Sequence, residues 1–258
     1  MKWMRFRHQG ADGFGRVEGD QVQVHQGDPF DRPQPTGLRL EIGAVEWLTP
    51  CRPSKMIGLW NNFAAAAEKN GWARPAEPLY FLKAPSSFTP HGADIPAPAG
   101  DAGRVGYEGE LAVVIGRRAR AVSASDAPAH IFGYTCANDV TAMELLQRDP
   151  SFPQWARAKG FDGFGAFGPV IATDVDLATA RLRTRVSGRE RQNFALADMF
   201  FGPAELVSRL SHDMTLEPGD VILCGTSLGA MPMKAGAVIE VEIDGVGVLR
   251  NRYATAPG

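Results

Sequence analysis

The spacing of glycine and proline constrains the fold most strongly. The chain has 29 glycines and 19 prolines among 258 residues, and they divide its apolar segments into short runs such as ELAVVIG and DVILCGT. Several runs alternate apolar and polar residues with a period of two, which is the pattern of a strand with one buried face. No run is both long and helical in its periodicity. The sequence therefore predicts an α+β protein dominated by antiparallel or mixed sheet, with few short helices.

The organisation along the chain follows from the same signals. Residues 1–25 are expected to form short strands, with VEGDQVQV folding as a hairpin through Gly19-Asp20. Residues 27–53 are rich in proline and turn residues, and we interpret them as the joint to the main domain. A small N-terminal β-domain with its linker is thus expected over residues 1–50, and a main domain over 51–258. The expected helices are 62–70, about 141–148, 154–159 and 197–211.

Composition excludes some classes of function. The hydrophobic content of 44%, the charged content of 22% and the net charge of −2 are those of an ordinary globular protein, so neither nucleic acid nor a membrane is expected as a partner. No apolar run approaches the ~20 residues needed to span a bilayer. The three cysteines are far apart in the sequence and suggest buried thiols in a reducing compartment. The start, MKWMRFRHQG, lacks an apolar signal core, and we expect a cytoplasmic protein.

Three acidic side chains are candidates for a metal site. Glu108 and Glu110, in YEGELAVVIG, lie two residues apart on a predicted strand and point to the same side. Two such carboxylates repel each other unless a cation or a proton lies between them, and oxygen ligands suit Mg²⁺, Mn²⁺ or Ca²⁺. Asp139 ends the apolar segment GYTCAND. Taken one at a time, a solvated strand face and a helix N-cap explain these residues better.

Five ordered segments resemble the fumarylacetoacetate hydrolase family, also called the acylpyruvase or 2-oxohept-3-ene-dioate isomerase superfamily. They are PLYFLKAPSSF, YEGELAVVIGRRAR, GYTCANDVTA, AKGFDGFGAFGP and LEPGDVILCGTSLG, and with the closing EVEIDGVGVLRN they cover roughly residues 50–251. One departure is Ala166 at the inner proline of the fourth segment. The resemblance implies a β-roll of mixed, mainly antiparallel sheets around a metal site, in a homodimer.

The resemblance also implies residue roles. Glu108, Glu110 and Asp139 match the three carboxylates that hold the metal, here Mg²⁺ or Mn²⁺. The family's active-site lysine and the aspartate three residues after it match Lys159 and Asp162. Three positions are expected to bind substrate: Thr226 through its hydroxyl; Lys83, for which capping of a strand end is an equal alternative; and Gln147, which is one residue out of register.

The family's catalytic histidine is missing. Members carry N-Y-x-x-H-x-x-E, in which the Glu orients the His to take a proton from water. This chain has NNFAAAAE, and aligning Asn61 with the family Asn puts Ala65 at the His position and Glu68 at the Glu position. Ala64 is the alternative His position, and alanine accepts no proton. Glu68 is then either a base whose pKa burial raises or a plain surface residue.

A second departure concerns substrate charge. The family often has Arg-Asp after N-D-V-[ST]-A, whereas this chain has Met143-Glu144. Arginine can bind a carboxylate through two parallel hydrogen bonds, and methionine cannot. We therefore expect a less anionic or differently shaped substrate, or a carboxylate that is held elsewhere.

Together these features predict a divalent-metal-dependent enzyme that acts on a small 2-oxo acid, diketo acid or other 1,3-dicarbonyl. Hydrolytic C–C cleavage of an acylpyruvate-type substrate is favoured, followed by decarboxylation, hydration and tautomerisation. The absent His weakens hydrolysis most, because hydrolysis needs an activated water. A binding protein without turnover is the alternative from another class, and the alanine could also have been introduced to trap a ligand.

Overall fold

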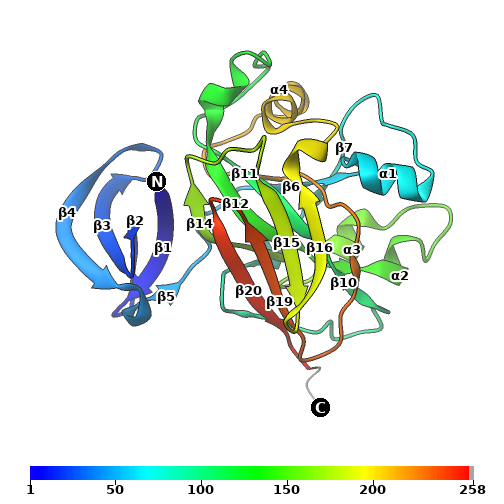
Figure 1. Ribbon diagram of the computed structural model, residues 1–258, viewed down its shortest axis with the longest axis horizontal. Helices are drawn as coiled ribbons and strands as arrows, with labels where there is room; N and C mark the ends of the chain where they lie inside the picture. Colours follow the sequence, from blue (N-terminus) through cyan, green and yellow to red (C-terminus); the bar gives the residue numbers. More distant parts are fainter. Residues whose placement is uncertain (256–258) are drawn as a thin grey trace.

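A large mixed sheet runs through the whole molecule (Figure 1). The structure is a computed structural model, and it describes residues 1–255. The twelve-stranded sheet has the order β4-β3-β2-β1-β14-β12-β11-β17-β6-β7, with β5 added to β1 and β8 to β14. Its strands are β1 (Lys2–His8), β2 (Ala11–Glu18), β3 (Gln21–Asp28), β4 (Asp31–Glu41), β5 (Glu46–Trp47), β6 (Met56–Trp60), β7 (Leu79–Lys83), β8 (Phe88–Thr89), β11 (Gly109–Ile115), β12 (Ile131–Asp139), β14 (Gly165–Ala172) and β17 (Val221–Leu223).

Two smaller sheets and four α-helices complete the fold of residues 1–255. The five-stranded sheet has the order β16-β15-β19-β20-β9, and the three-stranded sheet β13-β10-β18. Their strands are β9 (Asp94–Ile95), β10 (Val105–Tyr107), β13 (Thr141–Ala142), β15 (Arg181–Val186), β16 (Arg189–Ala195), β18 (Met231–Pro232), β19 (Val238–Ile243) and β20 (Gly247–Tyr253). The helices are α1 (Ala64–Asn70), α2 (Met143–Leu146), α3 (Trp155–Lys159) and α4 (Pro203–Asp213).

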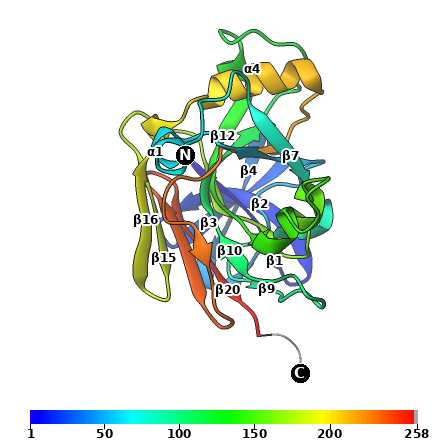
Figure 2. The same ribbon diagram turned by 90° about the vertical axis from the view of Figure 1, so that its right-hand side faces the viewer.

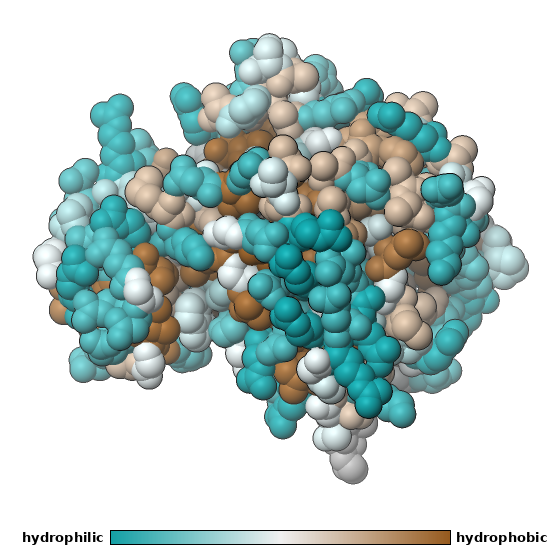
Figure 3. All heavy atoms as spheres, in the orientation of Figure 1, coloured by the Kyte–Doolittle hydropathy of each residue, from teal (hydrophilic) through white to brown (hydrophobic). Residues whose placement is uncertain are grey.

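The core lies between the five-stranded sheet and the middle of the large one. Strands β15, β19 and β20 pack on β11, β12 and β14, and every residue of β11 and β14 is buried. Figure 3 shows hydrophilic side chains over the outer face of the five-stranded sheet, where Arg183 pairs with Asp244 and Arg185 with Glu242. Figure 2 shows α4 lying across the top of the sheets. The central strands are therefore rigid supports for any side chain at their ends.

The expected α+β class and the scarcity of helices agree with the structure, and the helix boundaries differ in two places. The expected helix 141–148 shrinks to Met143–Leu146, because the two preceding residues pair with β10 as strand β13. The expected helix 197–211 is a short 3-10 turn, Leu196–Asp198, followed by α4. Pro203 has no backbone N–H to bond with an earlier turn, so it can only start the second helix. No helix within residues 1–255 is long and apolar enough to cross a membrane.

The interpretation of residues 27–53 as a joint is wrong. Eleven of them, Asp31–Glu41, form β4, which pairs with β3. Pro33 and Pro35 are tolerated because β4 is an edge strand, where a missing N–H costs no ladder hydrogen bond. The expected hairpin is confirmed, since Glu18 pairs with Gln21 and Gly19 has a φ of +64°. The expected buried thiols are also found, as all three cysteines are free and buried.

The N-terminal strands continue the central sheet. Lys2 and Trp3 of β1 pair with Ala172 and Ile171 of β14. Met4 and Phe6 are buried in the same apolar cluster as the main body. The boundaries 1–50 and 51–258 remain our proposal for two units of sequence, and the continuous sheet and core imply that these units unfold together.

We predict that Phe6→Ala destabilises the whole chain. Phe6 is 3% exposed, and truncating a buried phenylalanine typically costs about 3–5 kcal/mol. Urea unfolding followed by fluorescence and circular dichroism should show one transition that moves to lower urea. Leu38→Ala, at an exposed leucine of β4, is the matched control and should leave the midpoint in place. Two separate transitions, of which Phe6→Ala shifts only one, would contradict the prediction.

Candidate metal centre and active site

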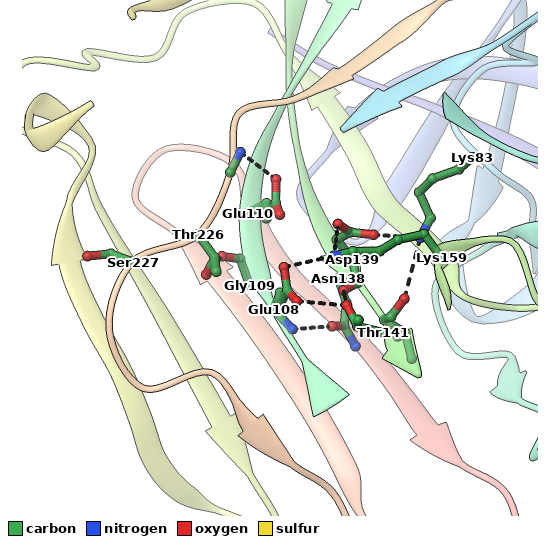
Figure 4. A network of polar contacts seen from close by, with 12 residues as sticks. Lys83, Glu108, Gly109, Glu110, Asn138, Asp139, Thr141, Lys159, Thr226 and Ser227 are labelled. Atoms are coloured by element: carbon green, nitrogen blue, oxygen red, sulfur yellow. Dashed lines mark hydrogen bonds and ion pairs between the residues drawn. The ribbon is translucent and has the colours of Figure 1, made fainter. Parts of the chain in front are cut away.

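Three carboxylates meet where β11 and β12 lie side by side (Figure 4). Gly109 pairs with Asn138, so Glu108 and Glu110 flank the end of β12 that carries Asp139. One oxygen from each of the three carboxylates lies within 4.8 Å of the others. Glu110 and Asp139 are fully buried, and Glu108 is partly exposed. The three residues that the sequence singled out as a metal site are therefore brought together.

Two buried lysines share this cluster. The Lys159 ammonium donates to Asp139 Oδ2 at 2.5 Å and to Glu108 Oε2 at 3.0 Å. The Lys83 ammonium donates to the other oxygen of Asp139. Lys83 ends β7 and its side chain is fully buried, and its roles as a strand-end cap or as a substrate contact both stay predictions. Three carboxylates against two ammonium groups leave the cluster one positive charge short, and buried charges require compensation.

The shifts in pKa show which side chains the excess negative charge affects. Burial opposes ionisation of Asp139, but the two lysines outweigh it and hold the pKa of Asp139 below its usual range. Burial also opposes the charged form of Lys159, and the carboxylates outweigh it and raise the pKa of Lys159. Burial and the charge of Lys159 lower the pKa of Lys83 despite its contact with Asp139. Burial and the charges of Asp139 and Glu108 raise the pKa of Glu110 well above the ordinary value.

The unpaired oxygen of Glu110 tests whether a metal fits. Glu110 Oε2 accepts from the Gly225 N–H at 2.6 Å, while Oε1 is buried and has no hydrogen-bond donor among residues 1–255. A buried carboxylate oxygen without a donor is costly unless a proton or a cation binds it. Oxygen-only ligand sets suit hard divalent ions. The donor set, the missing positive charge and the orphaned oxygen therefore fit a divalent metal.

A buried glutamine braces the backbone between the two glutamates. Gln192 of β16 accepts from the Gly109 N–H at 2.9 Å and donates to the Thr226 hydroxyl at 2.9 Å. The Thr226 hydroxyl donates to the Gly109 carbonyl at 2.8 Å, which closes a ring of three hydrogen bonds. A Cβ at residue 109 would lie 2.1 Å from the Thr184 hydroxyl, so only glycine fits there. This ring fixes the peptide that carries Glu108 and Glu110.

Sequence reasoning missed Gln192 and gave Thr226 a different role. The hydroxyl proton of Thr226 is directed to Gly109, so substrate contact by this residue stays a prediction. The available signal for Gln192 was its place on the period-two strand RERQNFA, where it shares a face with Phe194. A polar residue on the buried face of a strand must find partners there.

A cavity of about 510 Å³ opens beside Glu108 and is the candidate substrate site. Thr226 and Ser227 line one part of it, Met143 another, and Trp60 and Asn61 a third. Met143 is thus at the cavity, as the family pattern implied for the usual arginine. Asp162 and Gln147, both expected at the site, are exposed and contribute nothing to this lining.

Helix α1 faces the cavity with residues other than those expected. Ala66, Lys69 and Asn70 line the cavity, whereas Glu68 is exposed and outside the lining, and Ala65 donates its N–H to Asp198. The interpretation of Glu68 as a buried base is therefore wrong. The alignment on Asn61 thus puts neither Ala65 nor Glu68 at the cavity.

We propose a different alignment of α1, based on the residue that anchors it. Asn62 is buried and donates to the carbonyls of Phe201 and Cys224, and its side-chain oxygen accepts from the Phe201 N–H. Aligning Asn62-Phe63 with the family N-Y places Ala66 at the His position and Lys69 at the Glu position. In this proposed alignment, alanine replaces the histidine of the family pair and lysine replaces the glutamate.

Comparisons with known proteins agree with this architecture. The sequence model of the C-terminal domain of fumarylacetoacetate (FAA) hydrolase matches residues 55–254, and the Rv2993c-like N-terminal model matches residues 1–50. An oxaloacetate tautomerase of Bacillus subtilis is 36% identical over 214 residues, covering 78% of this chain and 70% of the relative. A bifunctional isomerase/decarboxylase of 4-hydroxyphenylacetate degradation from Salmonella dublin is 38% identical over 200 residues, covering 76% of this chain and 46% of the relative.

A solved structure extends the likeness to the whole fold. The 2-hydroxyhepta-2,4-diene-1,7-dioate isomerase from Mycobacterium marinum superposes with a TM-score of 0.90 at 35% identity, over 98% of both chains. The expected β-roll of mixed sheets with few short helices is confirmed by this match.

We predict that Gln192→Met weakens metal binding. The substitution keeps a side chain of similar length but removes the hydrogen bonds that fix Gly109, and losing such outer support typically costs about 10–100-fold in metal affinity. Titration with Mn²⁺, followed by electron paramagnetic resonance of the free ion, measures the effect. Gln147→Met makes the same change at an exposed position and should bind Mn²⁺ as the parent protein does. Equal affinities in the two variants would show that the ring does not support the site.

Proposed function

The chain belongs to the fumarylacetoacetate hydrolase family, and on that premise we propose that it is a divalent-metal-dependent enzyme that stabilises the enolate of a 2-oxo acid. The observation that carries this proposal is the buried Lys159 ammonium beside a three-carboxylate site that is short of one positive charge. Fixed positive charge in a dry site favours a reaction in which negative charge develops on an oxygen.

Each residue of the cluster has a distinct role in this proposal. Glu108, Glu110 and Asp139 would hold Mg²⁺ or Mn²⁺, which supplies Lewis-acid polarisation of the substrate oxygens. Lys159 is held in place by two of these carboxylates, and its ammonium group lies 5.0 Å from the centre of the Phe81 ring. It supplies the further positive charge that an enolate oxygen needs. Lys83 keeps Asp139 oriented from the opposite side.

The cavity wall favours decarboxylation over hydrolysis. Among residues 1–255, the side chains that line the cavity include no histidine, and their one carboxylate is Glu108 of the metal site. Hydrolysis needs a base that takes a proton from water. Loss of CO₂ from a 2-oxo acid with a second carboxyl group on carbon 3 leaves the bonding electron pair in the enolate, which takes a proton from solvent. Stabilisation of the enolate is all that this step demands of the protein.

Enol–keto conversion of the same acid uses the same stabilisation and is part of this proposal. The similarity to an oxaloacetate tautomerase and to an isomerase/decarboxylase supports it. Hydrolytic cleavage of an acylpyruvate-type substrate is the second candidate, because the matching family model describes a hydrolase. A binding protein without turnover is a further outcome of the tests below.

The reaction can be tested with a panel of small acids. With Mg²⁺ or Mn²⁺ present, we expect faster loss of CO₂ from oxaloacetate and faster enol–keto conversion, and both should disappear with a chelator. Lys159→Met should lower kcat by about 10²-fold or more, since it removes a charge that acts on the enolate. Lys234→Met, at an exposed lysine, is the control. Activity that is equal with and without metal, or unaffected by Lys159→Met, would contradict the proposal.

The missing His–Glu pair can be rebuilt. We predict that Ala66→His combined with Lys69→Glu raises hydrolysis of acylpyruvate by about 10²-fold or more, because the pair places a general base at the cavity. Ala65→His beside the native Glu68 is the matched control and should give no gain, because neither residue lines the cavity. The opposite ranking of the two variants would restore the register that the sequence first suggested.

The finer expectations of a homodimer and a cytoplasmic location remain predictions. Light scattering should give a mass of twice the 27.8 kDa of one chain for the dimer. A mass of one chain would reject it.

A further inference from the structure

The cavity beside Glu108 has an unusually apolar mouth. Several of the large hydrophobic side chains that this chain exposes line it together: Trp72 at 40% exposure, Met143 at 37%, Leu228 at 40% and Met231 at 52%. Single exposed apolar residues are ordinary, but a group that lines one cavity marks a surface that is covered when a ligand binds. The polar metal cluster therefore opens into an apolar outer chamber.

One wall of this chamber belongs to a row of aromatic rings that begins at the cluster. Lys159 lies over Phe81, and Phe81 stacks on Trp155 with ring centres 5.1 Å apart. Trp155 meets Trp60 at 6.2 Å, and Trp60 meets Trp72 at 5.0 Å. Trp60 and Trp72 present their rings to the cavity. The planes of Trp60 and Trp72 are tilted by 46°, so these two rings form an angled apolar wall, and the rings packed behind them hold it in place.

Two methionines, one on each side of β10, also line the chamber. Met231 of β18 pairs with Tyr107, next to Glu108. A Cβ at Gly106 would lie 3.0 Å from the Met143 sulfur, so the glycine leaves the room that Met143 occupies. Methionine side chains are flexible and polarisable, and they adapt to apolar groups of different shape.

We propose that the outer chamber binds an alkyl or aryl tail of the substrate, between the tryptophans and the methionines. The inference rests on the proposed function, since it takes the acid head of the same molecule to lie at the metal cluster. The charge of the chamber favours an apolar tail over a second distal carboxylate. Among the lining residues that the structure describes, the one cation is Lys69, on the exposed end of α1.

A series of oxamates tests the tail without requiring turnover. N-substituted oxamates keep the 2-oxo acid head, place their nitrogen where carbon 3 of the substrate would lie, and carry the substituent at the position of carbon 4. Titration calorimetry with Mn²⁺ present should show affinity that rises about two- to fourfold per methylene from oxamate to N-ethyl and N-butyl oxamate. N-phenyl oxamate should bind at least as tightly as the butyl compound.

Three variants test which side chains produce the gain in affinity along the oxamate series. Trp72→Ala and Met231→Ala should each reduce the gain from oxamate to N-butyl oxamate severalfold. Leu82→Ala changes an exposed leucine on β7 outside the cavity and should keep the gain, and thermal unfolding of each variant checks folding. N-carboxymethyl oxamate tests the alternative, in which Lys69 binds a second carboxylate of the substrate. In that case this compound should bind more tightly than the alkyl oxamates, and Lys69→Met should abolish its advantage.

The outcomes separate the two proposals. Failure of oxamate itself to bind in the presence of Mn²⁺ would overturn the proposed function. Oxamate binding with equal affinities across the alkyl series, or a preference for the carboxymethyl compound, would overturn the apolar chamber and leave the enolate site standing.

Discussion

The buried ion cluster around Asp139 holds the functional part of the molecule together. Its charges come from four elements, since Lys83 ends β7, Lys159 ends α3, Asp139 ends β12 and Glu108 adjoins β11. Burying a charged side chain without partners of opposite charge is strongly destabilising. Each of the four elements is therefore stable in its place only when the charged side chains of the others are also in place. The assembly still lacks one positive charge, and the orphaned oxygen of Glu110 marks where that charge belongs. Folding thus produces a site that favours a divalent cation.

The rest of the fold keeps this cluster rigid, whereas the side chains that line the cavity can be replaced without disturbing the cluster. The central strands are buried on both faces, and the ring of Gln192, Gly109 and Thr226 joins the two sheets at the glutamates. The cavity walls are different in kind, since much of their lining comes from α1 and the loop 226–230, beside the end of β6. Replacement of side chains on these segments changes the reaction or the substrate without disturbing the metal ligands. Ala66, Lys69 and Met143 line the cavity of this chain at such positions.

The sequence predicted the parts of the site that depend on local periodicity. Glu108 and Glu110 point together because a strand has a period of two, and the family segments located Asp139, Lys83 and Lys159. Gln192 and Asn62 were missed because their partners are mainly backbone groups far along the chain, which no local pattern reveals. The face of α1 that lines the cavity was not predicted, because a run of alanines carries no information about which face is buried. Strand β4 was misread because prolines signal turns, while an edge strand tolerates them.

The central claim is that the three carboxylates hold a divalent metal. Anomalous diffraction from crystals soaked in Mn²⁺ tests it most directly, because the signal locates the ion independently of any assumed reaction. Our account predicts one strong peak within about 2.0–2.2 Å of an oxygen of Glu108, Glu110 and Asp139, the distance expected of a small hard cation. The peak should be absent in crystals of Glu110→Gln soaked in the same way. A peak elsewhere, or none at these carboxylates in the parent protein, would contradict the account.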